Sequence, residues 1–127
     1  MMARSTIAVF AAALLLAPAL ASASEGKYEV DENKVYYGDA SSFEKPAAIL
    51  ISKVFDAIPE YVDARKKGKD DPQYYILLEK ANQKFFTALE RVAAAEKYDL
   101  IAEKGAVKSK ECRVPDATES VIKALPN

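Results

Sequence analysis

Apolar residues recur at three- and four-residue steps shortly after the first third of the chain, at Ile51, Val54, Phe55, Ile58, Tyr61 and Val62. This spacing predicts a helix with one apolar face on a core. Pro46 suits the first position of that helix, because its missing N–H has no helical partner there. Residues 47–51 form a short apolar run that is equally typical of a strand, so both assignments stay open.

Pro59 predicts a kink or a break, since proline removes a backbone donor and pushes the preceding residue away from helical angles. We expect a second helix to begin with Pro59. The sequence Arg-Lys-Lys-Gly at 65–68 indicates its end, because cations suit the last helical turn and glycine suits a left-handed cap.

A long helix is expected from Pro72 to about Lys97, preceded by Asp70 and Asp71 as start signals. Its apolar positions alternate four- and three-residue steps, as in a coiled-coil seam. The seam positions are Tyr74, Leu78, Ala81, Phe85, Ala88, Val92 and Ala95. The short loop at 68–71 makes the preceding helix the antiparallel partner, which gives a coiled-coil-like helical hairpin over about residues 47–97.

Further apolar residues widen the arc of the long helix beyond this seam. They are Tyr75, Leu77, Phe86, Leu89 and Ala93. One neighbouring helix cannot cover so wide an arc. The domain's own sheet, a second subunit and an apolar client protein are the alternatives, and we therefore treat these five residues as candidate protein-binding residues.

The remaining segments predict a small sheet. Residues 34–37 suit a short strand, and Gly, Asp and Ser at 38–42 indicate a turn. Residues 98–103 and 106–110 alternate in polarity around Lys104-Gly105, which is typical of a β-hairpin.

The sequence Asp-Ala-Thr-Glu at 116–119 resembles a capping box and predicts a C-terminal helix that buries Val121, Ile122 and Leu125. Together with the strands, this makes the predicted fold class α+β: an antiparallel helical hairpin, a small β-sheet and a short C-terminal helix.

The N-terminus has the pattern of a signal peptide over residues 1–23. Arg4 precedes ten consecutive apolar residues at 7–16, and small residues follow Pro18. We expect cleavage after Ala21 or Ala23, and therefore a periplasmic or secreted protein. Residues 24–34 are polar and charged, which predicts a flexible arm, and residues 35–127 form the single domain.

Composition restricts the chemistry that this domain can perform. The chain has no His, four Gly and one Cys, so the usual nucleophilic pairs and phosphate-binding loops lack their residues, and neither a catalytic, a metal nor a cofactor site is expected. The formal net charge is −1, which makes nucleic acid an unsuitable partner. Cys112 has no partner in the chain for a disulfide.

Three segments resemble the Skp (OmpH-like) periplasmic chaperones, of which this chain looks like a shortened and divergent member. They are Lys-Val-Phe-Asp-Ala-Ile-Pro-Glu-Tyr at 53–61, Tyr-Asp-Leu-Ile-Ala-Glu-Lys-Gly-Ala-Val at 98–107 and Asp-Ala-Thr-Glu-Ser-Val-Ile-Lys-Ala-Leu at 116–125. The resemblance implies a homotrimer with a small barrel of strands and with helical arms that hold unfolded outer-membrane proteins without ATP.

The expected function is therefore that of an exported, non-enzymatic protein-binding or chaperone-like protein, without stable membrane insertion. The alternative is a small periplasmic module that binds a ligand or has a structural role. The protein-binding function requires an exposed apolar helix face, whereas the alternative does not.

Overall fold

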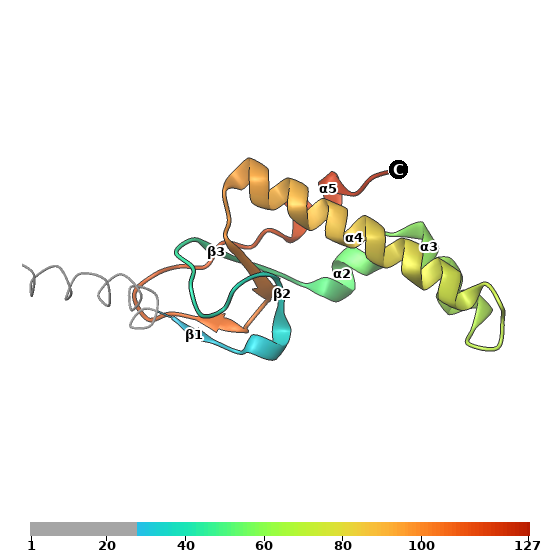
Figure 1. Ribbon diagram of the computed structural model, residues 1–127, viewed down its shortest axis with the longest axis horizontal. Coiled ribbons are helices and arrows are strands. Elements are labelled where there is room, and N and C mark those ends of the chain that lie inside the picture. Colours follow the sequence, from blue (N-terminus) through green and yellow to red (C-terminus); the bar gives the residue numbers. More distant parts are fainter. Residues whose placement is uncertain (1–27) are drawn as a thin grey trace, which may run out of the picture.

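The computed structural model describes residues 28–127, so the predicted signal peptide and its cleavage sites lie outside the described residues. The chain folds as an α+β protein with two small sheets (Figure 1). The strands are β1 (Glu29–Val30), β2 (Val35–Gly38), β3 (Pro46–Ile49), β4 (Leu100–Glu103) and β5 (Val107–Lys108). The helices are the 3-10 helix η1 (Glu32–Lys34) and α2 (Ile51–Asp56), α3 (Pro59–Lys67), α4 (Tyr74–Glu96) and α5 (Thr118–Ala124).

The larger sheet has the strand order β2-β4-β3, with β2 antiparallel and β3 parallel to β4. The parallel pair requires a long crossover, and α2, α3 and α4 supply it. On the other side of β3, the N–H of Ala48 donates to the carbonyl of Pro115, and the N–H of Ala117 donates to the carbonyl of Ala48. β3 is therefore hydrogen-bonded along both edges.

This position explains why residues 47–49 form a strand and why Pro46 begins β3 rather than a helix. All four residues of β3 are buried. Their partners, β4 and the segment at 115–117, are far away in the sequence, so no local pattern predicts that β3 pairs with them. The helical assignment for residues 47–49 is thus wrong, and helical structure begins with Ile51.

The predicted β-hairpin of residues 98–110 is also wrong in its pairing. A tight turn does exist, since the N–H of Ala106 donates to the carbonyl of Glu103 and Gly105 has a φ of 93°. However, β4 pairs with β2 and β3, whereas β5 pairs with β1 in a separate two-stranded sheet. Residues 29–34, predicted as part of a flexible arm, thereby contain β1 and η1.

Pro59 and Gly68 delimit α3 as the sequence predicted. Ile58 has extended backbone angles, which separates α2 from α3, and Gly68 has a φ of 82° at the C-terminal cap. α3 packs against α4 and, with only nine residues, accompanies just part of it. The ion pair of Glu60, in the first turn of α3, with Lys84, in the middle of α4, shows where this contact ends.

The second half of α4 packs on the remainder of the domain. The main core contains Ala81, Phe85, Ala88, Leu89, Val92 and Ala93 of α4 with Ala47, Ile49, Val54, Ile58, Ile101, Ala117 and Val121. It therefore joins α4 to β3, β4, α2 and α5. A smaller core lies under β1 and β5 and includes Phe43, Leu100 and Val107.

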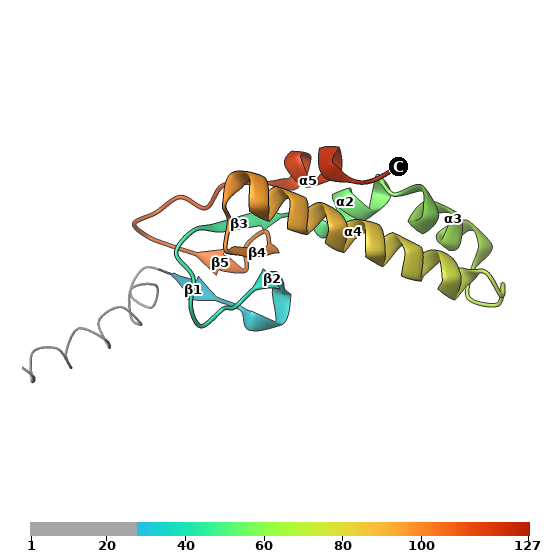
Figure 2. The ribbon, with the colours of Figure 1, turned by 45° about the horizontal axis from the view of Figure 1, so that its top comes forward.

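The α3 and α4 pair extends beyond the strands as a short arm, with the loop at 68–73 at its free end (Figures 1 and 2). Among residues 28–127, no helix has the length and apolarity that crossing a membrane requires.

Candidate functional site

Four large apolar side chains are exposed in the described part of the chain, and three of them lie on α4. Tyr75 is 65% exposed, Ile76 54% and Phe86 50%; the fourth is Leu50 at 37%. We call Tyr75, Ile76 and Phe86 the arm surface. Tyr75 and Phe86 are eleven residues apart, which is about three helical turns, so they project from the same side of α4 at a separation of roughly 16 Å along its axis.

The five residues predicted to bind protein divide into two groups. Tyr75 and Phe86 are exposed, and Leu77 is half-buried. Leu89 and Ala93 are buried in the main core, together with Ile101 of β4 and Val121 of α5. The prediction that these two residues lie on a surface open to a partner is therefore corrected, because the domain's own sheet and C-terminal helix cover them.

Ile76 was missed by the sequence reasoning, which sorted residues by their distance from the coiled-coil seam. Its position follows from the helix period, since Ile76 lies about 160° or more around α4 from the half-buried Tyr74 and the buried Phe85. A branched apolar residue on the side away from the core was the available signal.

The arm surface is supported by packed aromatic rings beneath it. Phe86 lies against Phe85 at a ring-centroid distance of 5.3 Å, and Phe85 contacts Phe55 at 4.9 Å and Tyr36 at 5.7 Å. Tyr75 lies at right angles to Tyr74 at 4.9 Å. These contacts fix the exposed rings on an ordered base, which lowers the entropy that binding would cost.

Tyr36 also connects the sheet to the start of the helical crossover. Its hydroxyl donates to Oε1 of Glu103 at 3.0 Å, and the same oxygen accepts the N–H of Ile51 at 3.0 Å. Burial, which disfavours the charged form, and the bond to Glu103 raise the pKa of Tyr36 to about 12. The neutral phenol is therefore a fixed structural donor.

The base of the arm contains a half-buried ion pair. Nζ of Lys84 lies 2.7 Å from Oε2 of Glu60, and both side chains are about one-fifth exposed. The bond from Lys84 holds the pKa of Glu60 below its usual range, against the opposing effect of burial. Oε1 of Glu60 is buried without a hydrogen-bond partner among residues 28–127. Among the described residues, Lys84 is therefore the side chain that hydrogen-bonds to this carboxylate.

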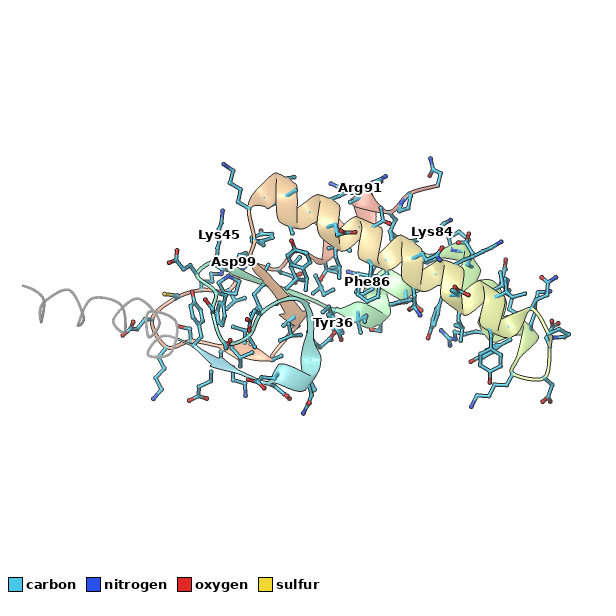
Figure 3. All side chains as sticks on the ribbon, in the orientation of Figure 1. Tyr36, Lys45, Lys84, Phe86, Arg91 and Asp99 are labelled. Carbon is cyan, nitrogen blue, oxygen red and sulfur yellow. The ribbon has the colours of Figure 1, made fainter. Side chains whose placement is uncertain are left out.

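A pocket of about 510 Å³ lies beside this ion pair. The junction of α2 and α3, the end of α5 and the C-terminal residues form its walls. It is lined by Ala57, Ile58, Pro59, Lys84, Ile122, Lys123, Leu125, Pro126 and Asn127. Lys84 and Phe86 lie on opposite edges of α4 (Figure 3), so the pocket and the arm surface face different directions.

The free end of the arm is rich in charge. Arg65, Lys66 and Lys67 end α3, and Lys69, Asp70 and Asp71 follow in the loop. Arg65 is engaged with Asp56 at 3.3 Å and lies over the ring of Tyr61. Asp71 accepts the N–H of Gln73 at 2.8 Å, which helps to start α4. Part of this charge therefore stabilises the helix ends.

No group of three or more metal-ligating side chains occurs within the described part of the chain. Cys112 is a half-buried free thiol whose backbone N–H donates to Oγ of Ser109. Comparison with protein families, curated proteins and solved structures gives no match for this chain. The site is thus defined by its own geometry.

Proposed function

We propose that this chain is an exported, non-enzymatic protein-binding protein that contacts unfolded or envelope proteins through the arm surface. The observation that carries the proposal is that three of the four exposed large apolar side chains of the described residues lie on α4, two on its projecting half and Phe86 at the base of the arm. An apolar surface of this kind gains free energy when a partner removes it from water.

The length of the arm favours short contacts. α4 has 23 residues, or roughly 34 Å, and its second half is packed on the domain, so Tyr75 and Ile76 lie on the projecting half and Phe86 lies at the base of the arm. A surface of this size suits an extended polypeptide segment with a few apolar anchors rather than an enclosed client. The resemblance to Skp-type chaperones agrees with such a role and adds the proposal of a homo-oligomer, a trimer by resemblance.

The test is suppression of aggregation by the purified protein when a urea-unfolded outer-membrane protein is diluted into buffer. Wild type is expected to reduce light scattering, and the double variant Tyr75→Ser/Phe86→Ser to lose most of this effect. Leu50→Ser is the matched control, since it removes an exposed apolar side chain outside the arm. Equal protection by both variants would refute the proposal.

Sedimentation of the same proteins tests self-association separately. If a second copy covers the arm surface, wild type sediments as an oligomer, and Tyr75→Ser/Phe86→Ser sediments as a monomer at the same concentration. An oligomer that survives the double variant is held together elsewhere.

A further inference from the structure

We propose that the pocket beside Lys84 is a binding site for a small carboxylate with an apolar body, such as a medium-chain fatty acid. This inference concerns a different face from the arm surface and does not depend on the proposed function. The pocket has a volume of about 510 Å³, which lies within the range of roughly 300–1,000 Å³ that is usual for small-molecule sites.

The walls of the pocket combine apolar side chains with polar groups. Ile58 lies at the break between α2 and α3, and Ile122 and Leu125 come from α5 and its cap, with proline rings at 59 and 126 completing the lining. Residues 57–59 and residues 122–127 are far apart in the sequence, so the pocket exists only where the fold brings them together. An alkyl chain placed against these apolar side chains is partly removed from water.

The charged lining side chains of the pocket are both cationic. Lys84 donates to Glu60 with one of its three N–H groups, which holds the ammonium in place and leaves two further donors. Lys123 lies in the last turn of α5 and is exposed. Glu60, the carboxylate next to the site, is paired with Lys84 through Oε2. A carboxylate ligand therefore meets two ammonium groups at the edge of an apolar wall.

Octanoate is the probe, with octanol as the uncharged match and acetate as the anion without an apolar body. Binding is followed by two-dimensional NMR on the purified protein, tagged at its N-terminal side because Pro126 and Asn127 line the pocket. Octanoate is expected to give saturable shifts at Ile58, Ile122 and Leu125. No saturable shift at these residues, or an equal effect of octanol or acetate, overturns the proposal.

Two variants locate the site. Lys123→Glu is expected to weaken octanoate binding about tenfold or more, because a charge-assisted bond is replaced by repulsion. Lys110→Glu makes the same charge change in a distant loop and is expected to leave binding unchanged. Ala57→Leu puts a larger side chain at the pocket wall and is expected to abolish binding. Equal affinity of wild type and both pocket variants contradicts the assignment.

Discussion

At the scale of single residues, Gly38 is the glycine of the described residues that leaves no room for a side chain. It ends β2 with a φ of 93°, and a Cβ there would collide with the backbone carbonyl of Asp99. The close approach matters because Asp99 fixes the loop before β3: its carboxylate accepts the N–H groups of Glu44 at 2.8 Å and Lys45 at 2.7 Å. The close packing of Gly38 against Asp99 therefore places the end of β2 next to the residue that holds the loop before β3.

Gly38→Ala is expected to lower the free energy of unfolding by about 3 kcal/mol or more, since left-handed strain adds to a backbone clash. Gly68→Ala is the matched control: its φ is 82°, but a Cβ there meets nothing within 4 Å. That variant is expected to lose only about 1–2 kcal/mol. Urea unfolding of both variants measures the difference, and equal losses would contradict the clash.

Tyr36 gives a pH-dependent prediction. Its pKa is about 12 in the folded protein and about 10 when exposed to water, so the folded state holds the proton more tightly. The stabilisation is complete below pH 10 and is lost as the pH rises from 10 to 12. Tyr36→Phe is expected to flatten this part of the stability profile, as measured by urea unfolding at each pH. An unchanged slope contradicts the prediction.

At the scale of elements, the ion pair of Glu60 and Lys84 fastens the base of α3 to α4. Lys84→Met is expected to cost about 2 kcal/mol, because the half-buried carboxylate of Glu60 is left without its donor. Lys53→Met is the control, since its pair with Glu119 is about two-thirds exposed and contributes about 0.5 kcal/mol or less. Thermal unfolding compares the two variants, and equal melting temperatures would show that the half-buried ion pair contributes no more stability than the exposed one.

Local signals were sufficient to predict α3 and α4, although α4 begins at Tyr74 rather than at the expected Pro72. Pro59 and Gly68 act through backbone angles that depend on a single residue, and Asp71 acts on the N–H two residues away. The sequence did not settle the pairing of β3, because its partners at 100–103 and 115–117 come much later in the chain. The turn at Gly105 was likewise evident, whereas the separation of β4 and β5 into two sheets depends on β1.

The candidate site shows the same division. Helical periodicity placed Tyr75 and Phe86 away from the seam, and both are exposed. It could not separate them from Leu89 and Ala93, because burial of these two residues depends on where the sheet and α5 dock. The period of a helix identifies its sides, but the tertiary fold decides which side meets water.

At the scale of the whole molecule, the domain has a packed body and a short arm (Figure 2). The body contains the sheets and α5, and the apolar contacts that hold it together are buried. The arm presents apolar side chains to water, which costs solubility. This division of roles is what a binding function predicts and what folding alone does not require.

Export is the second proposal at this scale. Mass spectrometry of the protein recovered from the periplasm or medium is expected to show an N-terminus at Ser22 or Ser24, after cleavage behind Ala21 or Ala23. Recovery of the intact chain from the cytoplasm alone would contradict the proposal of an exported protein.

The most direct test of the arm surface is photo-crosslinking with benzoylphenylalanine in place of Phe86. The purified protein is irradiated with an unfolded outer-membrane protein, and the same probe in place of Lys110 is the control. The account predicts an adduct with the client from position 86 and none from position 110. Protection of the client from aggregation without any adduct at position 86 would contradict it.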